Sequence, residues 1–279
     1  MAGMTQAALP PRQLDDLRRR LTELAPVVVA FSGGADSAFL AWVAHDALGP
    51  AAHAVTAISP SLASEDESDC RALAREWGLR WTPVVTHELA NPAYAVNDGQ
   101  RCYWCKAELM GALATVADEG GATVVLGVNL DDLDDHRPGQ RAAAERGAAF
   151  PLVEAGFTKA DVRDWSRRLG LRTWDKPAAA CLSSRVPYGT PVTLGVLESV
   201  GRAESALRRL GLRQLRVRHY GVLARLEVHP DELARAFEER QAVVDAVRQA
   251  GYTYVTLDLE GFRSGSLNQT LSSPALSVR

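Results

Sequence analysis

The stretch PVVVAFSGGADSAFL, residues 26–40, decides the fold of the N-terminal part of the chain. Residues 27–31 (VVVAF) form an apolar, largely β-branched run that is typical of a strand buried on both faces. The polar SGGADS follows, and a helix is expected over residues 38–45. A Gly-Gly turn between a buried strand and a helix N-terminus leaves backbone N–H groups free, and phosphate is the commonest anion that they bind. The stretch therefore predicts a phosphate-binding loop.

The composition is that of an ordinary globular protein. Of 279 residues, 47% are hydrophobic and 23% are charged, so the chain can bury a core. A net charge of −3 predicts no general attraction to nucleic acid or to an anionic membrane. No apolar run approaches the length of a membrane span, and residues 1–13 lack the apolar segment of a secretion signal. Four cysteines are too few for a disulfide framework, so reduced thiols and a cytoplasmic location are expected.

Strand-like and helix-like segments alternate after the phosphate loop. Further strands are expected at residues 52–59, 81–86 and 123–128, and helices at 64–77 and in the later part of 101–120. This alternation predicts an α/β fold, a doubly wound parallel sheet with helices on both faces. Ligands of such sheets lie beyond the carboxyl ends of the strands, so residues 32–37 and 129–135 are expected at one edge.

The C-terminal part has a different pattern. Residues 171–191 carry three prolines and little periodicity, which is typical of a long functional loop or a linker. The elements expected after this loop are a helix at 193–210, strands at 214–219 and 222–228, a helix at 230–250 and a strand at 252–259. The sequence thus predicts a domain at 1–190, which includes the loop with Cys181, and a smaller α+β domain at 191–279 for substrate contacts or oligomerisation.

The phosphate loop lacks the GK[ST] ending of a Walker A motif and the three-glycine spacing of a dinucleotide fingerprint. It resembles the SGGxDS loop of the PP-loop ATP pyrophosphatases. The resemblance implies that a substrate oxygen attacks the α-phosphate of ATP and releases pyrophosphate. The residues that would bind the pyrophosphate are Ser32, Gly33, Gly34 and Ser37. Asp36 would bind Mg²⁺.

Motifs further along the chain resemble the LarE family, ATP-dependent sulfur transferases of nickel-pincer nucleotide biosynthesis. The motifs are RCYWCK (101–106), NLDDLDDHRPG (129–139), PLVEAGFTKADVR (151–163), WDKPAAACLSSRVPYGTPVT (174–193) and LDLEGFRSGSLN (257–268). The likeness extends from the phosphate loop to the C-terminus. It implies that ATP adenylylates a carboxylate of a pyridinium dicarboxylate mononucleotide, which then becomes a thiocarboxylate.

Cys181 matches the cysteine that donates sulfur in this family. From the residues alone, a cysteine between Ala and Leu is more often a small buried hydrophobe, although nearby cations would favour its thiolate. Ser184 and Arg185 would line the catalytic site, and the planar guanidinium of Arg185 suits a phosphate or carboxylate. The resemblance also implies that Glu204 and Arg216 reach the substrate or pyrophosphate. An exposed ion-pair face is the alternative for these two residues.

Two routes for the sulfur stay open. In one, Cys181 gives up its own sulfur, becomes dehydroalanine and turns over once. In the other, Cys102, Cys105 and Cys181 hold a [4Fe–4S] cluster whose open iron carries sulfide. The CxxC pair by itself is half of a zinc site or a pair of reduced thiols. Cys70 is expected to pack within its helix.

Three functions therefore remain open. The leading hypothesis is a sulfur transferase that acts on a small nucleotide and, by the resemblance, forms a homo-oligomer. A PP-loop tRNA thiolase is the second, but a net charge of −3 indicates no basic stripe for RNA. The third is a sensor that binds ATP without turning it over.

Overall fold

The computed structural model describes residues 11–133, 138–177 and 180–263, and these form two compact units. The first unit takes its described residues from Met1–Ser59, Asp66–His87 and Cys102–Ala179. The second takes them from Pro60–Glu65, Glu88–Arg101 and Ala180–Arg279. The predicted loop at residues 171–191 is thus divided: residues 171–177 stay with the phosphate loop, whereas Cys181 and the residues after it pack with the C-terminal elements and not with the first domain, as the sequence had grouped them. The domain boundary at residue 190 itself stays a prediction.

The first unit is built on a parallel sheet of four strands, which confirms the predicted α/β class. The strands are β1 (Val27–Ala30), β2 (Ala52–Ile58), β3 (Arg80–Val85) and β4 (Thr123–Val125), in the order β3-β2-β1-β4. Val27 and Val29 join one apolar cluster and Val28 joins another, because successive residues of a strand face opposite sides of the sheet. The VVV run is therefore buried on both faces, as predicted.

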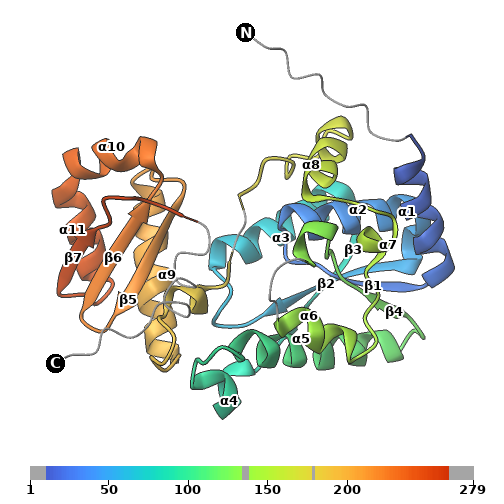
Figure 1. The fold of residues 1–279 in the computed structure, drawn as a ribbon, viewed down its shortest axis with the longest axis horizontal. Coiled ribbons are helices and arrows are strands. Elements are labelled where there is room, and N and C mark those ends of the chain that lie inside the picture. Colours follow the sequence, from blue (N-terminus) through green and yellow to red (C-terminus); the bar gives the residue numbers. More distant parts are fainter. Residues whose placement is uncertain (1–10, 134–137, 178–179, 264–279) are drawn as a thin grey trace, which may run out of the picture. The chain divides into compact units, whose positions relative to one another are not determined.

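Helices cover both faces of this sheet (Figure 1). On one face lie α1 (Pro11–Leu24), α2 (Ala35–Leu48), α3 (Ser64–Trp77) and α8 (Lys159–Arg168), and on the other lie α5 (Arg101–Asp118) and α6 (Pro138–Ala144). The chain places β2 and β3 on one side of β1 and β4 on the other. The carboxyl ends of β1 and β4 are therefore neighbours at the switch point of the sheet, where ligands bind in doubly wound folds.

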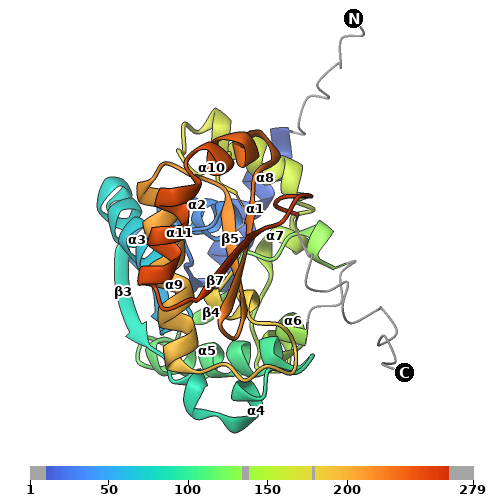
Figure 2. The same ribbon diagram turned by 90° about the vertical axis from the view of Figure 1, so that its left-hand side faces the viewer.

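The second unit contains a mixed sheet of three strands. Its strands are β5 (Leu215–Tyr220), β6 (Leu223–Val228) and β7 (Tyr254–Leu257); β5 and β6 are antiparallel, and β6 and β7 are parallel. Figures 1 and 2 show α9 (Leu194–Arg209) and α11 (Arg240–Gln249) side by side on one face. Val217 and Leu226 point into that core, whereas Arg216 and Glu227 lie on the opposite face.

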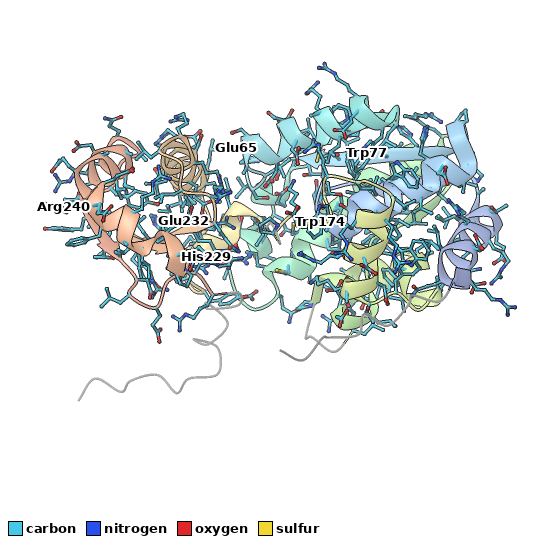
Figure 3. The ribbon with its side chains drawn as sticks, turned by 90° about the horizontal axis from the view of Figure 1, so that it is seen from above. Glu65, Trp77, Trp174, His229, Glu232 and Arg240 are labelled. Atoms are coloured by element: carbon cyan, nitrogen blue, oxygen red, sulfur yellow. The ribbon has the colours of Figure 1, made fainter. Side chains whose placement is uncertain are left out.

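The prediction of one continuous helix at residues 230–250 is wrong, because the structure has three shorter elements there. The structure has η5 (Pro230–Glu232), α10 (Leu233–Glu238) and α11, with Glu239 between the helices at φ −86° and ψ 17°. The carboxylate of Glu232, which is labelled in Figure 3, accepts hydrogen bonds from the N–H groups of Arg213 and Gln214. Neither Gly nor Pro interrupts residues 231–250, so no local signal marks the break.

The remaining elements are short. They are η1 (Gly49–Ala51), η2 (Glu88–Ala90), α4 (Pro92–Ala95), η3 (Leu130–Asp132), α7 (Pro151–Glu154) and η4 (Leu182–Arg185). Within the described ranges, no helix combines the length and the apolar character that crossing a membrane requires.

Candidate active site

Ser37 closes the phosphate loop of the first unit on itself. Its Oγ lies 3.0 Å from the Oγ of Ser32, accepts a hydrogen bond from the Ser32 N–H group and donates one to the carbonyl oxygen of Gly34. Gly34 is the N-cap of α2. In the part of the chain that the structure describes, the N–H groups of Gly33 and Gly34 donate to no protein acceptor. These groups lie at the positive end of the helix dipole, which favours a phosphate oxygen as their acceptor.

Gly33 occupies a position that no larger residue fits. Its φ is +69°, and a Cβ atom there would lie 2.8 Å from the Sγ of Cys70 on α3. Cys70 is buried in the core, as expected from the sequence. Its burial raises the pKa of the thiol to about 11, so the thiol stays neutral beneath the loop.

Lys176 also holds the phosphate loop. Its Nζ donates to the carbonyl oxygen of Gly33 (3.0 Å) and to the carboxylate of Asp69 (2.6 Å). Arg163 on α8 donates in turn to the carbonyl oxygen of Lys176 (3.1 Å). Sequence reasoning did not connect Lys176 with this loop, and its place in the WDKP motif is the signal that could have done so.

Asp36 and the residues after β4 come together at the switch point, as the topology predicts. The Nδ2 of Asn129 donates to the Oδ1 of Asp36 (3.0 Å), and the N–H group of Asn129 donates to the carboxylate of Asp132 (3.3 Å). Gly127 allows this approach, because a Cβ there would lie 2.9 Å from the Asp36 carbonyl carbon and from the Ser37 nitrogen. Asp134 and Asp135 of the same motif lie outside the described residues.

The oxygen atoms around Asp36 fit a magnesium ion. Burial raises the pKa of Asp36 above its ordinary value, although the hydrogen bond from Asn129 and the charge of Lys159 oppose the rise. The Oδ1 of Asn129 is buried and faces the N–H group of Asp132 in a capping box, but makes no hydrogen bond of standard geometry with the described residues. A carboxylate whose charge the protein compensates incompletely, beside an amide oxygen with a weak partner, suits a cation that takes oxygen ligands.

Cys181 in the second unit begins a short, tightly held loop. Its side chain is exposed, and it precedes η4, in which Leu182 and Ser183 are buried. The N–H group of Leu182 donates to the carbonyl oxygen of Ser61 (2.8 Å), and that of Ser184 donates to the carbonyl oxygen of Cys181 (2.9 Å). The structure thus presents the thiol of Cys181 on a backbone whose neighbouring residues are bonded into the unit.

Arg185 and Glu204 form a buried ion pair, not an exposed face. Their side chains are 6% and 0% exposed, and the Nε and Nη2 of Arg185 lie 2.7 Å and 2.9 Å from the two carboxylate oxygens of Glu204. The Nη1 of Arg185 donates to the carbonyl oxygens of Ala180 (2.6 Å) and Cys181 (3.1 Å) and to the Oγ of Ser184 (3.0 Å). Arg185 therefore braces the backbone on which Cys181 stands.

Arg216 is a buried cation on the polar face of the small sheet. It is 7% exposed, its guanidinium lies 4.6 Å from the centroid of the Phe262 ring, and no carboxylate of the described chain pairs with it. Burial lowers its pKa to about 10, and the charges of Arg185 and Arg218 lower it further, although the charges of Glu227 and Glu204 oppose them. The neighbouring Arg218, by contrast, pairs with Glu227 (2.8 Å) and donates to the carbonyl oxygen of Ser184 (2.7 Å). An anion near Arg216 would relieve this repulsion.

Cys102 and Cys105 lie in the first turns of α5 in the first unit. Cys102 is exposed and Cys105 is partly buried. A Cβ at Gly139 of α6 would lie 3.1 Å from the carbonyl oxygen of Cys102, so the glycine allows the two helices to pack closely. Over residues 11–133, 138–177 and 180–263, no three His, Cys, Asp or Glu side chains form a group that could hold a metal ion. The three-cysteine cluster stays a prediction.

Relatives of known and unknown activity align with nearly the whole chain, although no family model matches it. An uncharacterized protein of Synechocystis sp. is 47% identical over 93% of this chain and 98% of its own length. The pyridinium-3,5-bisthiocarboxylic acid mononucleotide synthase of Lactiplantibacillus plantarum is 37% identical over 92% of this chain and 94% of its own length. An uncharacterized protein of Methanocaldococcus jannaschii is 24% identical over 85% of this chain and 91% of its own length.

The likeness to the synthase is spread over the chain rather than confined to the phosphate loop. Its 260 aligned residues are too many for either compact unit alone, so it includes residues of both. The resemblance that the motifs indicated is confirmed, and with it the expectation of an enzyme. The chain belongs to the LarE family of sulfur transferases.

Proposed function

We propose that this protein uses ATP to convert a carboxylate of a pyridinium dicarboxylate mononucleotide to a thiocarboxylate, with release of AMP and pyrophosphate. The observation that carries the proposal is the setting of Cys181, whose thiol is exposed while Leu182, Ser183 and Arg185 behind it are buried. A free thiol on a braced backbone suits a nucleophile better than a packing residue. Neither a tRNA thiolase nor an ATP sensor has an observation that favours it.

The phosphate loop supplies the activation step. A carboxylate resists attack by a thiolate because resonance spreads its charge, so one oxygen must first become part of a leaving group. The substrate carboxylate attacks the α-phosphate of ATP, which gives an acyl adenylate and pyrophosphate. The N–H groups of Gly33 and Gly34 and the hydroxyl groups of Ser32 and Ser37 would bind the pyrophosphate. A Mg²⁺ ion held by Asp36 would neutralise the phosphate charge that develops.

Sulfur transfer follows in two steps. The thiolate of Cys181 attacks the acyl carbon of the adenylate, so that a C–S bond forms and AMP leaves. A base then removes the Cα proton of Cys181, and the bond between its Cβ and sulfur breaks. The electron pair of that bond goes to the sulfur, which leaves as the thiocarboxylate. The residue left behind is dehydroalanine.

The arginines of the second unit would bind the anionic groups of the nucleotide. Arg216 is buried and has no ion-pair partner among the described residues, so it suits a phosphate or the second carboxylate. Arg185, Ser184 and Glu204, which the resemblance also assigns to the site, are bonded to one another or to the backbone near Cys181. Their proposed contribution is to hold the nucleophile.

Mass spectrometry of the intact protein tests the sacrificial route. The protein is incubated with ATP, Mg²⁺ and the mononucleotide until one equivalent of product has formed. We expect the chain to lose the elements of H₂S, and peptide mapping to place dehydroalanine at residue 181. Product formed at one equivalent or more by a chain of unchanged mass would contradict this route.

The alternative sulfur source is a [4Fe–4S] cluster on Cys102, Cys105 and Cys181, whose open iron would carry sulfide. A [4Fe–4S] cluster is ordinarily held by four cysteine thiolates, so three of them would leave one iron open to sulfide. Protein purified without oxygen would then be brown and contain iron, and either Cys102→Ala or Cys105→Ala would remove both the colour and repeated turnover. Product from iron-free protein at the wild-type yield would contradict the cluster. Homo-oligomer formation and a cytoplasmic location stay predictions.

A further inference from the structure

Residues 88–101 of the second unit line the loop that follows Cys181. This segment, which we call the cradle, contains η2 and α4 and reaches the loop at residues 183–192 through both side chains and backbone. The N–H group of Gly189 donates to the carbonyl oxygen of Asn97 (3.0 Å), and that of Val192 donates to the carbonyl oxygen of Ala95 (2.9 Å).

Asn97 is the centre of this contact. It is completely buried, and its Nδ2 donates to the carbonyl oxygens of Val186 (3.3 Å), Pro187 (2.8 Å) and Thr190 (2.8 Å). Its Oδ1 accepts a hydrogen bond from the Nη1 of Arg101 (2.6 Å). The two hydrogens of this amide group are thus shared among three carbonyl oxygens of a loop that forms no helix or strand there, with the shorter contacts to Pro187 and Thr190.

The backbone conformation of Asn97 indicates that its side chain has a role in addition to forming the turn. Its φ is +59°, and it is the one residue other than glycine with a positive φ in the described chain. Glycine adopts this conformation without steric cost, whereas other residues disfavour it. If the turn were the sole requirement, glycine would meet it better. The asparagine amide donates hydrogen bonds to the loop that glycine lacks.

Two further cradle side chains hold Ser183, two residues after Cys181. The hydroxyl oxygens of Tyr94 and Ser183 lie 2.5 Å apart, and both side chains are buried. The Nη1 of Arg101 donates to the carbonyl oxygen of Ser183 (2.8 Å). The guanidinium of Arg101 also lies 5.4 Å from the centroid of the Tyr188 ring. The cradle therefore forms hydrogen bonds with the loop after Cys181 at two places, Ser183 and residues 186–190.

We propose that Tyr94, Asn97 and Arg101 are positioning residues for sulfur transfer, which act on Cys181 through the loop and touch no substrate. The inference rests on the proposed role of Cys181 as the sulfur nucleophile. Attack on the adenylate requires the thiolate to approach the acyl carbon, and elimination requires the Cα proton of the same residue to face a base. Both depend on the backbone of residue 181, and small misplacements of reacting atoms are costly in rate.

Asn97→Gly is the variant that tests the proposal most directly. It removes the side-chain hydrogen bonds while relieving the backbone conformation, so the turn is preserved. We expect single-turnover thiocarboxylate formation to slow about 10- to 100-fold, while pyrophosphate release in the first turnover stays at the wild-type rate. We also expect amide hydrogen exchange at residues 182–192 to quicken at least about tenfold, with no change in α9 or β6.

Asn91→Gly is the matched control. Asn91 lies in the same segment, and its side chain accepts a hydrogen bond from the N–H group of Ala93 at the start of α4. Glycine is well tolerated at an N-cap, so this variant should behave as wild type in both reactions. If Asn97→Gly transfers sulfur at the wild-type rate, or slows both reactions equally, the positioning role is wrong. If the wild-type protein itself releases pyrophosphate without thiolating the substrate, the proposed function fails instead.

A double-mutant cycle on Tyr94 and Ser183 gives a second test should Asn97→Gly fold poorly. Tyr94→Phe and Ser183→Ala each remove one hydroxyl of the pair, and the double variant removes both. A positioning contact predicts that each single change slows transfer about 3- to 30-fold and that the double variant is no slower than the worse single one. If the two single changes slow transfer independently, so that their effects add in the double variant, Tyr94 and Ser183 do not act as a pair and the positioning contact is wrong. Tyr252→Phe, which removes a buried hydroxyl 3.2 Å from His219, is the matched control and should leave transfer unchanged.

Discussion

Protein carrying Cys181→Ala is expected to release pyrophosphate from ATP in the presence of the mononucleotide and to form no thiocarboxylate. The phosphate loop lies in the first unit, and the side chains that hold it, Ser37 and Lys176, belong to that unit, whereas Cys181 does not. Adenylylation therefore keeps its residues, whereas transfer loses its nucleophile. The first-turnover rate of pyrophosphate release should stay within about twofold of wild type. Pyrophosphate and thiocarboxylate are measured in the same quenched reaction.

Added sulfide distinguishes a missing nucleophile from a damaged site. Hydrosulfide can attack the accumulated acyl adenylate directly, forming the C–S bond as AMP leaves. The alanine variant should therefore make thiocarboxylate when sulfide is supplied, at a rate that rises with sulfide concentration. Formation of thiocarboxylate by this variant at the wild-type yield without added sulfide would show that Cys181 is not the donor. If Cys181→Ala also fails to release pyrophosphate, adenylylation depends on Cys181 and is not separable from sulfur transfer.

The parts of the site that sequence could predict depend on local pattern and on topology. The VVV run, the SGGADS turn and the alternation of elements suffice to place Asp36 and Asn129 at one edge of the sheet, and the structure joins the two side chains there by a hydrogen bond of 3.0 Å. This works because the carboxyl ends of parallel strands share one edge whatever the details of packing. The family could likewise be recognised from the motifs around Cys181, because they are long and unusual in composition.

The parts that sequence could not predict depend on contacts between distant segments. Lys176 lies 143 residues from Gly33, and Asn97 lies 89 residues from Val186, so no spacing rule connects them. For Arg185, the sequence could not predict which groups its side chain would contact. Its type suits an anion, but whether its donors face a ligand or the carbonyl groups of Ala180 and Cys181 is decided by tertiary packing.

Glu204→Ala should destabilise the second unit more than any other single change considered. It would leave Arg185 buried without its partner and the N–H group of Val217 without the acceptor that now lies at 3.0 Å. Removing one member of a buried ion pair typically costs about 3–5 kcal/mol, because the remaining charge stays out of water. The exposed pair of Arg235 and Glu239 in the same unit provides the control. Glu239→Ala should cost less than about 1 kcal/mol.

Because of where the tryptophans lie, the loss of stability in the second unit can be measured separately from that of the first. All six tryptophans belong to the first unit, so their fluorescence follows that unit alone, whereas circular dichroism follows both. In urea, Glu204→Ala should move the circular dichroism transition of the second unit to lower concentration and leave the tryptophan transition in place.

Replacing both partners with apolar residues, as in Arg185→Met with Glu204→Leu, should recover much of the stability. That double variant should still transfer sulfur slowly, because the carbonyl groups of Ala180 and Cys181 would remain without their donor. Equal urea midpoints for Glu204→Ala and Glu239→Ala would contradict the buried pair.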